Sequence, residues 1–181
     1  GLFDLTPFSK FEIFSENAYE ELQKICTANI KNEIGKCTYT QMLNSDGGIE
    51  TDLTVICLDK DYFRIISSAA TRERDKFHIK KHLHEDIELK DVTDDFCVFG
   101  LFGPKSRDLI QSLSNDNFEN DNFKFATAKY IIIEGVKIWA QRLSYVGELG
   151  YELYVEFKDA KKIYDLIIEV GKNFELSNCG M

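Results

Sequence analysis

The chain has 181 residues, of which 44% are hydrophobic and 29% charged, a balance typical of a globular protein rather than a disordered or fibrous one. Its 22 basic and 31 acidic residues give a formal net charge of −9, which argues against a general nucleic-acid binder or a polybasic membrane binder. Apolar runs such as residues 130–133 are strand-sized and fall far short of the ~20 residues of a membrane span.

The first half of the chain predicts short strands, tight turns and two helices. Ser15 is a plausible N-cap for the first helix, and apolar residues then recur at helical spacing. In residues 52–58 the alternation places Leu53, Val55 and Cys57 on one face of a strand and Asp52, Thr54 and Ile56 on the other. The predicted strands are 11–14, 38–43, 52–58 and 62–66, the turns 44–48 and 59–61, and the helices 16–26 and 71–83.

The second half continues the mixture of strands and helices. Pro104 is well placed in the first turn of a helix that runs to Leu113. The predicted strands are 96–102, 129–133, 136–143 and 151–157, the polar loop is 114–122, and the last helix is 159–170. Because short turns join the strand pairs, the sequence predicts an α+β fold with a mostly antiparallel sheet and packed helices.

Five cysteines are scattered along the chain without a C-x-x-C pair. An odd, dispersed set fits buried thiols in a reducing compartment better than a disulfide framework. The chain opens on Gly1 rather than Met and stops shortly after a helical pattern, so we expect a piece of a longer protein.

A first candidate site lies around the turn at residues 44–48. One interpretation is an ordinary hairpin, in which Asp52 is a solvated residue on the outer face of the sheet. The alternative is that Asp52 and Thr54, two residues apart, project together into a cavity. Such a pair could hold the polar edge of a ligand or accept a proton.

A second candidate site lies in residues 142–154. One interpretation is a tight Gly-x-x-Gly turn between two strands, with acidic residues outside. In the other, Tyr145 before the turn and Glu152 after it share one rim, where a tyrosine face can stack on a flat heterocycle. A carboxylate can accept two parallel hydrogen bonds from adjacent N–H donors, and a pterin ring offers such an edge.

A third cluster holds the three histidines, His78, His82 and His84. His78 and His82 are four residues apart, a spacing that could place two metal ligands on one helix face. No fourth ligand is evident and lysines crowd the segment, so a solvated charged helix is favoured and no metal is predicted. A nucleotide-binding G-x-G-x-x-G or Walker loop is also absent from the sequence.

Four blocks together resemble the tetrahydrofolate-binding aminomethyltransferase family, which includes the glycine cleavage T-protein and the C-terminal folate domain of dimethylglycine and sarcosine dehydrogenases. Residues 47–55 read Gly-Gly-x-x-x-Asp-Leu-Thr-Val, and residues 144–154 read Ser-Tyr-Val-Gly-Glu-Leu-Gly-Tyr-Glu-Leu-Tyr. Both runs look more like the dehydrogenase branch than the T-protein, which usually reads Gly-Tyr-Thr-Gly-Glu in the second. The four blocks are residues 1–11, 39–55, 98–107 and 142–154.

The resemblance implies a role for each matched residue. Asp52 aligns with an aspartate beside the reactive folate nitrogens, the general base of one-carbon transfer, and Thr54 with a folate-contacting position. Tyr145 aligns with the tyrosine that lines the pterin pocket, and Glu152 with the glutamate that grips the pterin edge. Tyr39 aligns with a motif tyrosine and is included among the cofactor-binding residues.

The resemblance also implies cofactors and partners. Tetrahydrofolate is the expected cofactor, and a methylated amine or aminomethyl donor is the expected second small molecule. FAD is expected only in an N-terminal flavin domain of the parent protein or in a flavin subunit. Residues 1–181 would then be one folate-binding domain, truncated because the C-terminal half and the flavin domain are absent. The family implies a cytoplasmic protein, or one of the mitochondrial matrix in a eukaryote.

Three functions remain open at this stage. The first is folate-dependent one-carbon transfer within a flavin-linked demethylating dehydrogenase. The second is the free-standing aminomethyltransferase of glycine cleavage, and the third is a non-catalytic regulatory protein that keeps the fold. The Lys-Gly-Cys-Tyr-x-Gly-Gln-Glu motif of the tRNA-modification branch is absent from the sequence, which disfavours that branch.

Overall fold

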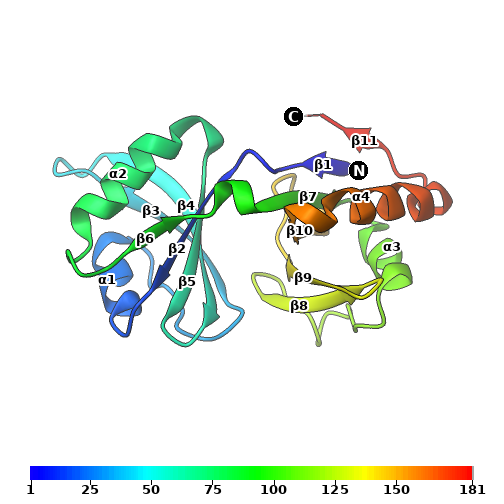
Figure 1. The fold of residues 1–181 in the computed structure, drawn as a ribbon, viewed down its shortest axis with the longest axis horizontal. Helices are drawn as coiled ribbons and strands as arrows, with labels where there is room; N and C mark the ends of the chain where they lie inside the picture. The colour runs from blue at the N-terminus through cyan, green and yellow to red at the C-terminus, as the bar shows by residue number, and fades with distance from the viewer. Residues whose placement is uncertain (181) are drawn as a thin grey trace. The chain divides into compact units, whose positions relative to one another are not determined.

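The computed structural model describes residues 1–180 and divides the chain into two compact units, each with its own sheet and core (Figure 1). The insert unit is Pro7–Thr93. The flanking unit is Gly1–Thr6 together with the chain from Asp94 onward. None of the helices formed by residues 1–180 combines the length and the apolar composition that crossing a membrane requires.

The insert unit is built on a five-stranded antiparallel sheet in the order β3-β4-β5-β2-β6. The turn between β3 and β4 forms because the side chain of Asn44 accepts hydrogen bonds from the N–H groups of Asp46 and Gly48, at 3.0 and 2.9 Å. Gly47 completes that turn with a φ of 79°, a value that favours glycine. The elements are β2 (Ser9–Phe14), α1 (Ala18–Ile25), β3 (Cys37–Leu43), β4 (Ile49–Asp59), β5 (Tyr62–Ser67), η1 (Ala69–Thr71), α2 (Arg72–His82) and β6 (Leu89–Asp91).

The core of the insert unit lies on one face of this sheet. Leu53, Val55 and Cys57 of β4 are buried there, which confirms the predicted alternation. They pack with apolar residues of both helices, including Leu22 of α1 and Ile79 of α2. The core face therefore fixes the register of β4, and a one-residue slip would bury its polar side chains instead.

The flanking unit contains a six-stranded sheet in the order β11-β1-β7-β10-β9-β8, in which only the β1–β11 pair is parallel among the described residues. Apolar residues of α3 and α4 share one core with Tyr151, Leu153 and Val155 of β10. The opposite face of β10 therefore carries Glu152 and Tyr154. The elements are β1 (Leu2–Asp4), η2 (Thr93–Asp95), β7 (Phe96–Phe102), α3 (Ser106–Leu113), β8 (Ala128–Ile133), β9 (Val136–Gln141), β10 (Gly150–Glu156), α4 (Phe157–Gly171), η3 (Lys172–Phe174) and β11 (Asn178–Cys179).

The predicted α+β class with mostly antiparallel sheets is confirmed, and two details of helix initiation are wrong. Ser15 is not an N-cap, because α1 begins at Ala18 after Asn17, and the Ser15 hydroxyl instead accepts a 3.3 Å hydrogen bond from the Asn17 N–H. Pro104 lies in the turn before α3, which begins at Ser106. All five cysteines are free thiols.

Candidate functional site

The insert unit brings Tyr39, Asp52 and Thr54 together on the face of the sheet opposite its core. Tyr39 of β3 is paired directly with Thr54 of β4, and the Tyr39 hydroxyl donates a 2.9 Å hydrogen bond to Oδ2 of Asp52. Tyr39 and Asp52 are exposed, whereas Thr54 is half-buried. The two motif residues predicted to act together, Asp52 and Thr54, thus share a face with the tyrosine whose role the sequence left undefined.

The hydrogen bond between Tyr39 and Asp52 orients the carboxylate. Its effect on the phenol is to raise the pKa of Tyr39, so that the hydroxyl stays protonated and remains the donor. The other carboxylate oxygen, Oδ1, accepts no hydrogen bond from residues 1–180. Asp52 is therefore held at one oxygen and open at the other, an arrangement suited to accepting a proton.

The flanking unit carries Glu152 on the face of β10 that points away from the core. The Tyr154 hydroxyl donates a 3.1 Å hydrogen bond to Oε2 of Glu152. Burial raises the pKa of the Glu152 carboxyl to about 7, although the Tyr154 hydrogen bond opposes that rise. A carboxylate whose ionised form lacks solvation in this way is stabilised by any ligand that offers it N–H donors.

Tyr145 lies in the segment between β9 and β10, just before the strand that carries Glu152. Its side chain is 80% exposed. The segment turns sharply at Gly147, whose φ is 75°, and the Ser144 hydroxyl accepts a hydrogen bond from the Val146 N–H at 3.3 Å. Tyr145 therefore lies in a turn directly before the strand that carries Glu152.

The five predicted residues are divided between the two units. Tyr39, Asp52 and Thr54 form one set, in the insert unit, and Tyr145 and Glu152 belong to the flanking unit. Their convergence on one ligand stays a prediction.

Gln141, Trp139 and Tyr154 lie on the same face of the sheet as Glu152, and the sequence analysis did not identify them as site residues. Gln141 lies directly opposite Glu152, and Trp139 directly opposite Tyr154, in the β9–β10 ladder. Gln141 is polar yet fully buried, at the end of the otherwise apolar run Ile138, Trp139 and Ala140. Alternation places Gln141 with Lys137 and Trp139 on the face opposite the core residues Ile138 and Ala140, so no pattern in the sequence marks Gln141 as buried.

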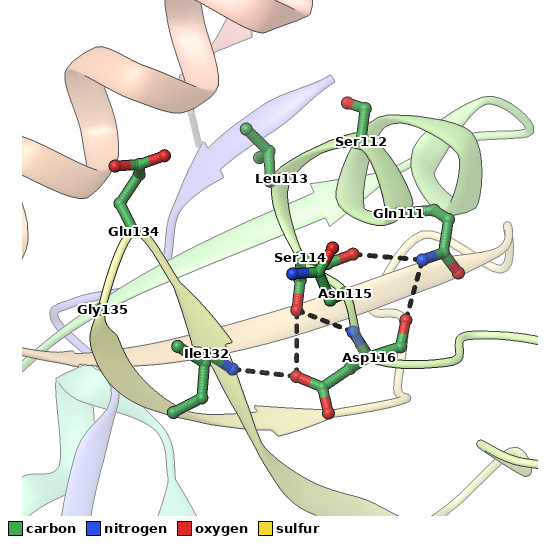
Figure 2. Close-up of a pocket in the computed structure, with 9 residues that line it drawn as sticks. All are labelled: Gln111, Ser112, Leu113, Ser114, Asn115, Asp116, Ile132, Glu134 and Gly135. Atoms are coloured by element: carbon green, nitrogen blue, oxygen red, sulfur yellow. Dashed lines mark hydrogen bonds between the residues drawn. The ribbon is translucent and has the colours of Figure 1, made fainter.

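A cavity of about 540 Å³ in the flanking unit contains none of the predicted site residues (Figure 2). Its polar groups bond mainly to one another. Oδ2 of Asp116 accepts hydrogen bonds from the Ser114 hydroxyl and the Ile132 N–H, both at 2.9 Å, and the Gln111 amide donates to the Asp116 carbonyl at 2.8 Å. These bonds hold the loop after α3 against β8. The polar groups of the cavity therefore serve to fix this loop, and we assign no ligand to the cavity.

The three histidines lie on or just after α2 in the insert unit. The His78 and His82 rings are 4.5 Å apart between centroids, and a ring nitrogen of His82 lies 2.8 Å from the His78 carbonyl oxygen. Among residues 1–180, no group of three or more His, Cys, Asp or Glu side chains is arranged to hold a metal ion.

Replacing Glu152 with glutamine should stabilise the ligand-free protein at neutral and higher pH. Because the folded-state pKa of about 7 exceeds the unfolded value of ~4.3, the folded protein binds more protons between those values, and the free energy of unfolding falls as pH rises through that window. The variant should lose this slope and gain about 1–3 kcal/mol at pH 8. Urea unfolding at pH 5 and pH 8 measures the effect.

The matched control is Glu156→Gln, which makes the same change at an exposed position in the same strand. We expect its pH dependence to follow that of the unsubstituted protein. If the free energy of unfolding of Glu152→Gln changes between pH 5 and pH 8 by the same amount as that of the unsubstituted protein, the raised pKa of Glu152 is wrong.

Comparison with known proteins yields relatives over almost the whole chain. It is 33% identical over 180 residues to 4-methylaminobutanoate oxidase (formaldehyde-forming) of Paenarthrobacter nicotinovorans and 31% identical over 183 residues to mitochondrial dimethylglycine dehydrogenase of Rattus norvegicus. It covers 22% and 21% of these two proteins and 99% of itself in each case. It is also 31% identical to an aminomethyltransferase of Halothermothrix orenii, matching 100% of this chain and 50% of that protein. The chain thus spans between a fifth and a half of the length of these relatives.

Two solved structures share the fold. The glycine cleavage system aminomethyltransferase T of Bartonella henselae matches 93% of this chain and 45% of its own with a TM-score of 0.79 at 19% identity. A heterotetrameric sarcosine oxidase of Corynebacterium sp. U-96 matches 98% of this chain and 86% of its own with a TM-score of 0.74 at 11% identity. The model of the GCVT N-terminal domain matches residues 1–181, and the chain therefore belongs to the GCVT N-terminal domain family.

Proposed function

We propose that this chain binds tetrahydrofolate and promotes transfer of a one-carbon unit to it, as part of a flavin-linked demethylating dehydrogenase of the dimethylglycine or sarcosine type. The observation that carries the proposal is the Asp52 carboxylate, held at one oxygen by Tyr39 and open at the other, in a member of this family. Relatives that include a dimethylglycine dehydrogenase and a methylaminobutanoate oxidase support the dehydrogenase setting.

The chemistry assigned to Asp52 follows from the substrate. Oxidation of a methylated amine leaves an iminium ion, whose carbon is electrophilic. A folate nitrogen attacks that carbon and forms a C–N bond while the iminium π electrons move to the amine nitrogen. When the second folate nitrogen displaces the amine, the folate has lost two protons, one of which leaves with the amine. Asp52 stabilises the cation electrostatically and accepts the other proton.

The other predicted residues position the folate. The Glu152 carboxylate accepts hydrogen bonds from two adjacent N–H donors of the pterin, and Tyr145 stacks on the ring. Thr54 contributes a polar contact next to Asp52, and Tyr39 keeps Asp52 oriented. Fixing the folate nitrogen beside the iminium carbon makes the reaction effectively unimolecular, which accounts for much of the expected acceleration.

FAD would reside in another domain or subunit and would supply the amine oxidation. In the glycine cleavage alternative, supported by the aminomethyltransferase relatives, the one-carbon unit arrives on an aminomethyl donor and no flavin is needed. In the regulatory alternative the chain keeps the fold and catalyses no transfer. A flavin absorption spectrum of the full-length protein, purified together with any subunit that it binds, distinguishes the first two alternatives.

The experiment that tests the proposal uses the full-length protein. Titration with tetrahydrofolate should show saturable binding, and a single turnover with dimethylglycine or sarcosine should yield methylenetetrahydrofolate in place of free formaldehyde. Binding without transfer from either amine or an aminomethyl donor would favour the regulatory alternative. Absence of tetrahydrofolate binding would overturn the proposal.

A further inference from the structure

The side-chain amide of Gln141 is buried without a partner on the Glu152 face of the flanking unit. Gln141 is 0% exposed, and neither its Nε2 nor its Oε1 forms a hydrogen bond within residues 1–180. It pairs directly with Glu152 across the β9–β10 ladder, so both side chains project from the same face of the sheet. The Trp139 N–H, two residues earlier on the same strand face, is also buried and unpartnered.

A buried amide without a hydrogen-bond partner lowers the stability of the folded protein, and the residues that precede Gln141 in its strand are apolar. Natural proteins satisfy the great majority of buried polar groups, and an unsatisfied donor and acceptor lower stability. Methionine has a similar length and would fill the same space without polar atoms. The amide is therefore better explained by a polar group that arrives from outside the protein.

The chemistry of the neighbouring carboxylate indicates what that group is. Glu152 accepts hydrogen bonds and can take two adjacent N–H donors, whereas the amide of Gln141 offers both a donor and an acceptor. A 2-amino-4-oxo heterocycle presents an amino group, a ring N–H and a carbonyl oxygen in a row along one edge. Glu152 matches the first two groups, and the donor of Gln141 matches the third.

We propose that Gln141 is a second binding residue for the pterin edge, its Nε2 donating to the ring carbonyl next to the N–H groups held by Glu152. This inference rests on the proposed function, because the ring that it contacts is that of tetrahydrofolate. The ring would thus give the Gln141 amide nitrogen an acceptor and the Glu152 carboxylate two N–H donors. Gln141 thereby contributes to recognition of the oxidised carbon of the ring rather than to the transfer step.

Gln141→Met in the full-length protein should move affinity and stability in opposite directions. Tetrahydrofolate should bind about 10-fold more weakly, since the ring carbonyl loses its donor. The ligand-free variant should unfold at a higher urea concentration than the unsubstituted protein, because the unpaired buried amide is gone. A tetrahydropterin without the benzoylglutamate tail should lose affinity by the same factor, because the contact is to the ring.

The matched control is Gln111→Met in the same unit. Gln111 already donates to the Ser114 and Asp116 carbonyls, so this variant should lose some stability and keep its folate affinity. A double-mutant cycle that combines Gln141→Met with Glu152→Gln should show non-additive effects on folate affinity, because both side chains contact the same edge of the ring.

The outcomes separate this inference from the proposed function. Tetrahydrofolate binding that Glu152→Gln weakens and Gln141→Met leaves unchanged would overturn the role of Gln141 alone. A ligand-free Gln141→Met protein that is less stable than the unsubstituted protein would show a structural role and would also overturn it. Failure of the unsubstituted protein to bind tetrahydrofolate would overturn both proposals.

Discussion

Asp52→Asn should slow one-carbon transfer by about 10²–10⁴-fold, the usual effect of losing a general base. Folate affinity should be largely retained, because asparagine has the same size and keeps an oxygen that can accept the hydrogen bond from Tyr39. The amide cannot take the proton that the folate nitrogen loses. Single-turnover formation of methylenetetrahydrofolate measures the rate, and tetrahydrofolate titration measures the affinity.

Asp59→Asn is the matched control for this prediction. Asp59 is exposed at the other end of the same strand, β4, where its carboxylate accepts a 2.7 Å hydrogen bond from the Lys60 N–H. This variant should transfer the one-carbon unit at the unsubstituted rate. If Asp52→Asn abolishes folate binding instead of slowing transfer, Asp52 is a binding residue and its assigned role is wrong.

Glu152→Gln should weaken tetrahydrofolate binding by about 1.5–3 kcal/mol, the scale of a hydrogen bond to a charged group. An amide oxygen cannot match a carboxylate that accepts two N–H donors, and the amide NH₂ would face one of those donors. Binding to the unsubstituted protein should also strengthen as pH rises through about 7, since the carboxyl must ionise to accept both bonds. Titration with tetrahydrofolate at pH 6 and pH 8 measures both effects.

The exposed Glu156 supplies the control, and Glu156→Gln should bind folate as the unsubstituted protein does. A Glu152→Gln variant that binds normally and slows only transfer would show that the roles of Glu152 and Asp52 are reversed. If neither Asp52→Asn nor Glu152→Gln changes affinity or rate, the folate site lies elsewhere on the protein.

Much of the fold could be predicted because its longer strands are rich in apolar residues and are bounded by turn residues. The buried Leu53, Val55 and Cys57 define one face of β4, and turn residues such as Gly47 mark its start. The strands β1, β6 and β11 contain only two or three residues each, too few for a periodic pattern, and depend on pairing with distant segments. Helix starts also escaped prediction, because Ser15 bonds locally to the Asn17 N–H rather than capping α1.

The candidate site could be predicted only in part. Residue spacing indicated that Asp52 and Thr54 share a face, but the hydrogen bond from Tyr39 depends on the register of β3 against β4. The pairing of Gln141 with Glu152 likewise depends on the β9–β10 register, which a sequence pattern does not specify at single-residue precision. The raised pKa of Glu152 comes from tertiary burial, and no short motif encodes burial.

The proposed function requires that Asp52 and Glu152 contact the same folate molecule. A crystal structure of the full-length protein with tetrahydrofolate bound tests it most directly. We expect the amino and N–H edge of the pterin on Glu152, with Asp52 facing the reactive folate nitrogens. Tetrahydrofolate bound elsewhere, or Asp52 and Glu152 on separate surfaces without a shared ligand, would contradict it.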